Sequence, residues 1–262
     1  MVAKYFNFSW EITKLNILAA MEYRANFWLQ VIGMFINDIG LLLGWYVVFL
    51  SFPQINGWQF SEIVLLFAIS TSHFGLAQIF AGGVQHLAKT IANGQLDYFL
   101  AFPKPILWHV LISSTNISAI GDLAFGFSIF FLFCTPTVLS SISFLVVVLL
   151  TTCIYINIFI ILGSLAFYLK SFEEVSSQYG AILLGFCLMP QSVFVGAVKI
   201  VMMTLFPAYF LVALPADFIH QWNWLSLVEL TMFTVLTFDL AWIVFYRGLK
   251  KYESGNLINV KT

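Results

Sequence analysis

Apolar stretches of about 20 residues follow one another along most of this chain, separated by short polar or proline-containing segments. A helix needs about 20 predominantly apolar residues to cross the hydrocarbon core of a bilayer. The pattern predicts six membrane-spanning helices, at residues 27–52, 60–83, 106–134, 143–168, 175–195 and 225–246. The connections leave no room for a soluble domain of about 100 residues. We therefore expect an all-α polytopic membrane protein with a single domain over residues 1–262.

Residues 1–25 carry their charges on one narrow stripe. At about 100° per residue, Lys4, Asn7, Glu11 and Lys14 fall on one side of a helix, and aromatic and aliphatic residues fill the remaining circumference. A wide apolar face with a thin charged stripe is typical of a helix that lies in the membrane interface. The alternative, the first turns of a long spanning helix, would place four charges inside the bilayer. We expect an interfacial helix over residues 1–25.

Prolines interrupt the chain between the fifth and sixth predicted spans. Pro190, Pro207 and Pro215 divide an apolar stretch into pieces too short to cross about 30 Å of hydrocarbon. We expect two short helices in residues 196–220 that enter the outer leaflet and return, because such pieces are tolerated where their free backbone groups face protein or water. Eight spanning helices would require two of about 11 residues each, so six is the better interpretation.

The 11 Lys and Arg residues are distributed unevenly across the predicted membrane. A composition that is 61% hydrophobic and only 9% charged excludes an ordinary soluble domain. With a cytoplasmic N-terminus, all of them except Lys199 fall on the cytoplasmic side: Lys4, Lys14, Arg24, Lys89, Lys104, Lys170, Arg247, Lys250, Lys251 and Lys261. Because cytoplasmic loops carry the Lys and Arg excess, we expect both termini in the cytoplasm of a multi-pass inner-membrane protein. No basic run is long enough to indicate a nucleic-acid partner.

No catalytic or metal-binding constellation occurs in the sequence. The GxxxxGK[ST] phosphate loop, HExxH and GxSxG are all absent, so the chain has no such machinery of its own for hydrolysing ATP. Cys134, Cys153 and Cys187 lack metal-ligand spacing, and their odd number argues against a disulfide framework. The histidines are dispersed and are interpreted as structural or interfacial: His73, His86, His109 and His220.

Three acidic residues are candidate polar positions inside the membrane: Asp38, Asp122 and Asp239. A carboxylate near the bilayer centre costs about 2.5–3.5 kcal/mol on insertion scales and should face other helices or water. One interpretation places them along a polar pathway for cargo. The other, which we favour, has them accept hydrogen bonds from neighbouring helices, with Asn116, Asn157 and Thr237 as candidate donors. Lys199 and Asp217 are expected to pair near the outer mouth.

Residues 84–104 form the longest connection on the predicted cytoplasmic side. A short helix ending at Asn93 is expected to stop at Gly94, because glycine is favoured just past a helix C-terminus. A second short helix would then place Leu96, Phe99 and Leu100 on an apolar face beside Asp97. The pattern predicts a rigid elbow between two spans that receives force from a cytoplasmic partner. The alternative is a plain amphipathic connector resting on the membrane.

Two motifs carry a resemblance to a known family. The first is I-x-x-G-x-L-D-x-x-L-x-x-P between the second and third predicted spans, formed by Ile91, Gly94, Leu96, Asp97, Leu100 and Pro103. The second is the stretch Gly-Leu-Lys-Lys-Tyr-Glu-Ser-Gly-Asn at residues 248–256. With these motifs, the chain resembles the permease subunits of ABC-2-type transporters, and the closing motif resembles one branch of that family. The resemblance covers nearly the whole chain.

The resemblance implies a half-transporter that pairs with a second permease, identical or different, and docks two ATP-binding subunits. ATP and Mg²⁺ would then be bound by those subunits, with no cofactor on this chain, which is not expected to be an enzyme by itself. The elbow would be a coupling helix, and export from the bacterial cytoplasm is the implied direction. Its ATPase-coupling residues would be His86, Lys89, Gly94, Gln95, Leu96, Asp97, Phe99 and Leu100. Residues 1–25 and 170–174 would make secondary contacts, and membrane lipid is the other expected partner.

Two functions from other classes were weighed against this interpretation. A secondary transporter driven by an ion gradient predicts internal repeats and clustered ionisable residues inside the membrane, but the sequence shows no repeat and only dispersed acids. A membrane enzyme acting on lipids would need convergent His, Asp or Glu residues near one interface, which the sequence does not supply. The cargo stays open.

Overall fold

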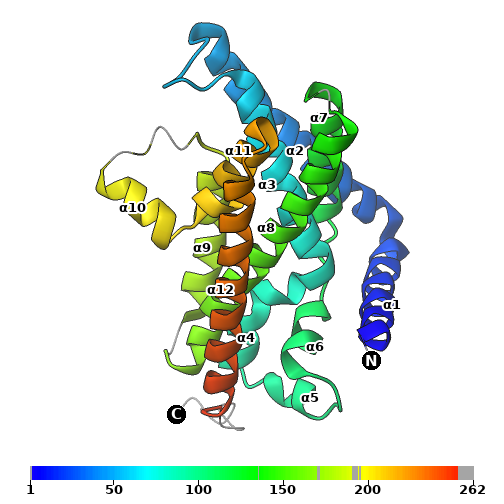
Figure 1. Ribbon diagram of the computed structural model, residues 1–262. Coiled ribbons are helices and arrows are strands. Elements are labelled where there is room, and N and C mark those ends of the chain that lie inside the picture. Colours follow the sequence, from blue (N-terminus) through cyan, green and yellow to red (C-terminus); the bar gives the residue numbers. More distant parts are fainter. Residues whose placement is uncertain (1, 135, 170–171, 191–193, 195, 253–262) are drawn as a thin grey trace.

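Helices make up the whole regular structure of the described chain (Figure 1). The computed structural model describes residues 2–134, 136–169, 172–190, 194 and 196–252. Within these ranges the only extended pairing is an isolated bridge between Ile55 and Trp58. The all-α class expected from the sequence is therefore confirmed.

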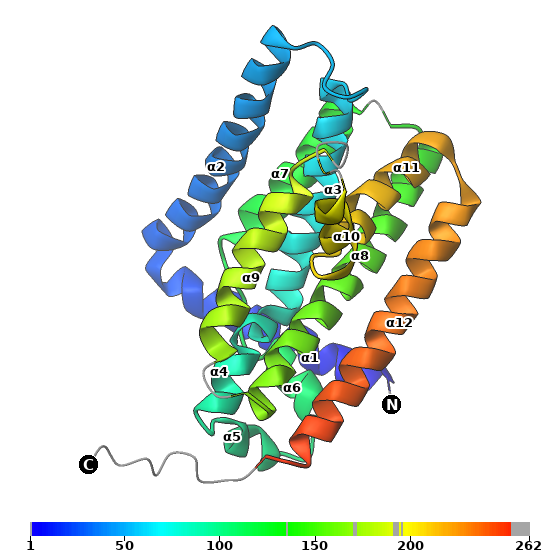
Figure 2. The ribbon, with the colours of Figure 1, turned by 90° about the vertical axis from the view of Figure 1, so that its left-hand side faces the viewer.

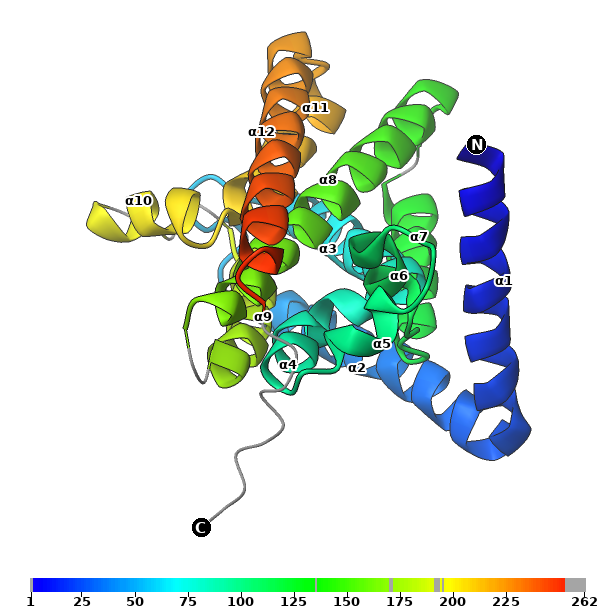
Figure 3. The same cartoon turned by 90° about the horizontal axis from the view of Figure 1, so that it is seen from below.

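The N-terminal helix turns away from the bundle. Helix α1 (Val2–Ala20) is joined by the 3-10 turn η1 (Met21–Tyr23) to α2 (Arg24–Ser51). Tyr23 leaves the helical region with φ −101° and ψ 72°, which changes the direction of the chain. Figures 2 and 3 show α1 crossing one end of the bundle while α2 runs along it. Residues 2–20 thus form a helix that differs in direction from α2, and an interfacial helix over residues 1–25 stays a prediction.

Helix α3 (Phe60–Ala81) lies at the centre of the bundle. It starts with a capping box, in which the Gln59 side chain accepts from the backbone of Glu62 and the Glu62 side chain accepts from the Gln59 N–H. Its side chains are buried on every side, as expected of a helix in the interior of a larger bundle. Helices α2, α7 (Ala119–Phe133) and α8 (Val138–Ser164) pack around it, and α12 (Trp224–Leu249) packs on α8.

The third predicted span, 106–134, is not one helix. It divides into α6 (Ile106–Ile112) and α7, with a non-helical segment at residues 113–118. Two hydrogen bonds tie this segment to α3: the Asn116 N–H donates to the Gln78 carbonyl at 3.0 Å, and the Thr115 hydroxyl donates to Ile79 at 3.1 Å. Ser, Thr and Asn offer the backbone such alternatives to helical bonds, which explains the break.

Short helices follow the fifth predicted span. Helix α9 (Phe172–Cys187) begins three residues before the expected start at Val175 and ends before Pro190. Then come α10 (Ala197–Thr204), the π-helical turn η5 (Tyr209–Ala213), α11 (Leu214–Gln221) and α12. Pro215 lies in the first turn of α11, where proline costs no hydrogen bond, so it does not break that helix. Residues 196–220 thus contain short helical elements, and a helix pair that enters a membrane and returns stays a prediction.

Four helical segments of the described chain are long and apolar enough to cross a membrane: 7–51, 60–92, 138–167 and 224–249. Helices α7 and α9 have 15 and 16 residues, because of the break at 113–118 and the end at Cys187. These two are the remaining crossings that a total of six would require, so the number six stays a prediction.

The connection from α3 to α6 lies at the same end of the bundle as α1 and the end of α12 (Figure 1). It consists of the 3-10 turn η2 (Gly82–His86), α4 (Leu87–Ala92) and α5 (Leu96–Leu100), and the 3-10 turn η3 (Leu165–Phe167) follows α8 nearby. Elements at or towards this end carry most of the described basic residues: Lys14, Arg24, Lys89, Lys104, Arg247, Lys250 and Lys251. Lys199 lies apart from them, on α10.

Glycine allows the chain around the break to approach α3 closely. A Cβ at Gly83 would overlap the carbonyl oxygen of Val110, and one at Gly82 would lie 2.7 Å from the Ser114 oxygen. We therefore expect Gly83→Ala to destabilise the protein by about 1–3 kcal/mol, because the two backbones would have to move apart. Thermal unfolding of the purified protein in detergent measures this.

Gly44→Ala is the matched control, because Gly44 is exposed on α2 and nothing lies within 4 Å of an added Cβ. In a helix this change is neutral or stabilising by up to about 1 kcal/mol. Equal melting temperatures for the Gly83 variant and the wild type would show that the close approach is not required.

Candidate functional site

The segment 84–104 folds as the elbow that the sequence predicts. After α4, the Gln95 N–H donates to the Thr90 carbonyl at 2.9 Å, and the Gly94 N–H donates to Ile91 at 3.2 Å. These two bonds form a Schellman motif, which needs a left-handed residue, and Gly94 has φ +70°. The expected stop at Gly94 is confirmed, and it turns the chain directly into α5.

One face of the elbow is fixed inside the bundle. Leu87 and Leu96 are fully buried, and Gly163 on α8 makes room for Leu87, since a Cβ at Gly163 would lie 2.9 Å from that side chain. The Gln85 amide donates to the Tyr155 hydroxyl of α8 at 3.1 Å. A satisfied polar contact in a buried position holds the two elements in one register. The elbow is therefore fixed to α8 and continues directly from α3.

The opposite face of the elbow is exposed and aromatic. Tyr98 is 63% exposed and Phe102 is 41% exposed, and their ring centroids lie 5.0 Å apart. Among the predicted coupling residues, those that are also exposed are His86, Lys89, Gln95 and Leu100. Tyr and Phe with flanking polar groups are the composition of a protein-binding surface.

The role expected for Leu96 is corrected by its burial. Its side chain lies inside the elbow and cannot fill a cleft of a partner in this conformation. The other predicted residues that do not point outward are Gly94, which is buried, and Asp97 and Phe99, which are half-buried. These four lie within the elbow, whereas Tyr98 and Phe102, which are not among the predicted residues, are exposed on its surface, and which residues couple to a partner stays a prediction.

Phe99 connects the elbow to α1 through His109 of α6. The His109 ring packs against Phe99 with centroids 5.1 Å apart and against Phe8 of α1 at 5.8 Å. Burial, and then the charge of Lys104, lower the pKa of His109 from its ordinary value. The Lys104 ammonium lies 4.3 Å from the centroid of the Phe8 ring, a cation–π distance.

A polar contact strengthens the attachment of α1. The Trp108 indole N–H donates to the Ser9 hydroxyl at 2.9 Å, and the Asn16 amide donates to the Thr115 hydroxyl at 3.3 Å. Helix α1 is therefore bound to α6 and to the break at 113–118. Helix α6 in turn packs on the elbow through His109 and Phe99. No local pattern predicts these two hydrogen bonds, because each joins residues 99 positions apart.

The end of α12 closes on the elbow from the other side. A Cβ at Gly248 would overlap the Phe167 ring, so glycine allows α12 to reach η3. The Tyr252 ring lies 6.2 Å from that of Phe167, and its hydroxyl lies beside Asp97. Burial, and then the Asp97 carboxylate, raise the pKa of Tyr252 to about 12. The two sequence motifs thus meet in space at Asp97 and Tyr252. Residues 253–256 of the second motif lie outside the described residues.

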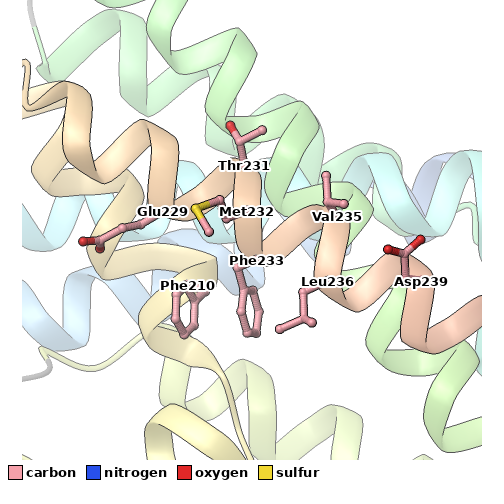
Figure 4. A pocket seen from close by; sticks show the side chains of 8 residues that line it. All are labelled: Phe210, Glu229, Thr231, Met232, Phe233, Val235, Leu236 and Asp239. Carbon is pink, nitrogen blue, oxygen red and sulfur yellow. The ribbon is translucent and has the colours of Figure 1, made fainter.

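The three candidate polar positions inside the membrane do not form one group. Asp38 on α2 and Asp122 on α7 are each 3% exposed, and their carboxyl groups lie within hydrogen-bonding reach of each other. Asp239 is exposed on α12, where it lines a groove of about 660 Å³ together with Glu229 (Figure 4). Apolar side chains of α12 separate these two acids along the groove.

The predicted donors for these acids bind elsewhere. The Asn157 amide donates to the Thr237 hydroxyl at 3.3 Å and so links α8 to α12. At the break in the third span, the Asn116 N–H donates to the Gln78 carbonyl and its side-chain oxygen accepts from the Ser118 hydroxyl. The ion pair expected between Lys199 and Asp217 does not form, since Asp217 lies nearer to Glu62 and His220. Among the described residues, no group of three His, Cys, Asp or Glu could hold a metal ion.

Comparison with known proteins agrees with this arrangement. The sequence profile of the family described as ABC-2 family transporter protein matches residues 35–255. Searches of curated proteins and of solved structures returned no match. The matched range covers most of the chain and includes the elbow, every segment from α3 to α12 and most of α2. This multi-pass, all-helical membrane protein therefore belongs to the ABC-2 transporter family, whose members form the permease part of a transporter.

Proposed function

We propose that this chain is the membrane-spanning subunit of an exporter driven by separate ATP-binding subunits. The observation that carries the proposal is the two-sided elbow of residues 84–104. Its inner face is fixed to α3 and α8, while Tyr98, Phe102 and Leu100 are presented outward at the end of the bundle. A rigid element with an exposed apolar face receives force from a partner and passes it to the helices on which it is fixed.

The chemistry of the exposed face fits a protein cleft. Aromatic residues contribute most to protein interfaces when they enter a pocket of the partner, and the polar residues around them remain at the rim. Here Tyr98 and Phe102 would be the anchors, with His86, Lys89 and Gln95 around them. ATP and Mg²⁺ would be bound by the partner, because the phosphate-binding motif is absent from this sequence.

Helix α1 and the end of α12 would act with the elbow. Both pack on it, α1 through Phe8 and α12 through Tyr252, so a displacement of the elbow would reach α2 and α12. A second permease, identical or different, would complete the pathway. Six crossings with both termini in the cytoplasm would follow if α7 and α9 also span. The grouping of Lys and Arg towards the elbow end supports that orientation.

The first prediction from this proposal concerns the orientation of the chain in the membrane. In a chain with Cys134, Cys153 and Cys187 replaced by Ser, we expect a membrane-impermeant maleimide to label Lys199→Cys in intact cells. Gln95→Cys should react only after the membrane is permeabilised. Both positions are exposed, so a difference in labelling reports the side of the membrane. Labelling of Gln95→Cys in intact cells would overturn the coupling proposal.

The second prediction concerns the exposed face. The double variant Tyr98→Asp/Phe102→Asp should lose the co-purifying ATP-binding subunit. Loss of an interface anchor costs about 2 kcal/mol or more, which weakens binding about 30-fold. Its melting temperature should stay close to that of the wild type, because both side chains are exposed.

Phe52→Asp is the control, because Phe52 is 63% exposed like Tyr98. It directly follows Ser51, at the end of α2 that is remote from α1. It should leave co-purification unchanged. Leu96→Asp should instead lower the melting temperature, because it would bury a carboxylate inside the elbow. Full recovery of the ATP-binding subunit with the double variant would show that the partner binds elsewhere.

The third prediction concerns pH. Because the pKa of His109 is lowered, its neutral form stabilises the packing of α1. That contribution is present above the ordinary histidine pKa of about 6.5 and is lost as the pH falls below it. Spin labels at Ala19→Cys and Ser113→Cys should report a longer or broader distance at pH 5 than at pH 8.

His109→Phe is the matched variant, because phenylalanine keeps a ring in the cluster but cannot take up a proton. Its distance distribution should not change between the two pH values. An equal response in both proteins would assign the movement of α1 to another titrating group.

A further inference from the structure

The carboxyl groups of Asp38 and Asp122 meet where α2 crosses the start of α7. Each residue is 3% exposed, and each carboxyl lies within hydrogen-bonding reach of the other. Asp122 is in the first turn of α7, a helix that starts here only because the third span is broken at 113–118. The structure thus brings two acids from distant parts of the sequence into one buried contact.

Nothing around the pair neutralises two negative charges. The Oδ2 atoms of both residues are buried, and no donor from the described residues reaches them. The elements packed at the pair, α2, α3 and α7, contain no Lys or Arg except Arg24 at the first position of α2. The Asn37 side chain, which bonds to Asp38, is uncharged.

The remaining titratable groups on these elements do not supply a counter-charge either. Tyr155 of α8, which interacts electrostatically with Asp122, is a neutral phenol. The His73 ring of α3 packs on the Tyr155 ring with centroids 5.9 Å apart, and its Nδ1 donates to the Ile69 carbonyl. Glu62 lies in the first turn of α3, distant from the pair along the helix. An acid pair without a cation is left to share a proton.

We propose that Asp38 and Asp122 form a proton-binding site that holds one proton while α2 is packed on α7. A hydrogen bond between two carboxyl groups requires a proton on one of them, and two adjacent negative charges in a membrane interior would repel each other. The one negative charge that remains lies at the N-terminus of α7, where the helix dipole stabilises it. When the proton leaves, both groups are charged and α2 separates from α7.

Helix α2 is attached to the bundle by few buried residues. Asp38 is the only one of them between Val31 and Phe49. Next to the pair, a cavity of about 590 Å³ separates α2 from α3 and α7, with Phe35, Leu42 and Phe125 among its apolar walls. The packing of α2 is therefore concentrated on α7, where Gly121 approaches Val31 and Phe35 contacts Phe125, so the carboxyl pair lies within the contact that holds α2.

Infrared spectroscopy of the purified chain tests whether the proton is present. At neutral pH the wild type should show the carbonyl stretch of a protonated carboxylic acid, and the band should vanish in both Asp38→Asn and Asp122→Asn. Asp239→Asn is the control and should keep the band, because Asp239 is exposed on α12. A wild type without the band, or a band that survives both pair variants, would overturn the proposal.

Spin labels at Val47→Cys and Phe131→Cys, both exposed, test the consequence in a cysteine-free chain. The distance between α2 and α7 should increase as the pH is raised. With Asp38→Asn it should stay short at every pH, because the amide donates to Asp122 without losing a proton. Asp122→Asn, tested in the same way, replaces it if that variant does not fold.

A distance that follows the Na⁺ concentration at constant pH would show a metal-cation site instead of a proton site, and so would overturn the proposal. A distance independent of pH in the wild type would do the same. The experiment uses the chain without ATP-binding subunits. Its failure therefore leaves the coupling proposal untouched, and failure of the coupling proposal leaves the proton site untouched.

Discussion

Close contact of helix backbones with α3 holds the rest of this bundle in place. Helices in a membrane gain little from leaving lipid for one another, so packing and hydrogen bonds must supply the stability. Gly75 of α3 brings α7 within contact, since an added Cβ would lie 2.8 Å from Leu123. Gly82 and Gly83, directly after α3, do the same for the break at 113–118 and for α6 respectively. Because the elbow continues directly from Gly83, its position is fixed by the central helix of the bundle.

Of the two motifs that carry the family resemblance, the first shapes the elbow mostly from within, and its exposed residues there are Leu100 and Pro103. Gly94 makes the turn, Leu96 fills the interior, and Tyr252 from the second motif lies beside Asp97. The exposed anchors, Tyr98 and Phe102, stand at positions that the motif leaves open.

Local patterns predicted the helices and the stop at Gly94, because hydrophobic periodicity and glycine act over a few residues. The local patterns missed the break at 113–118 because apolar runs lie on both sides of it. The polar groups of the break are satisfied by carbonyl groups of α3, which only the tertiary structure reveals. The local patterns also misassigned Leu96, because α5 is apolar on both faces and five residues do not define which face is buried. The contacts of Asp97 with Tyr252, and of Asp38 with Asp122, depend on tertiary packing that no local pattern contains.

The break in the third span separates the functions of its two halves. Non-helical backbone inside a membrane protein must be satisfied by protein or water, and here α3 accepts its hydrogen bonds. Below the break, α6 belongs to the elbow through His109, and above it α7 belongs to the bundle through the α3 and α2 contacts. No continuous helix joins α6 to α7. The same break creates the helix start at which Asp122 meets Asp38, so the structure links α2 to α6 through α1 and to the carboxyl pair through α7.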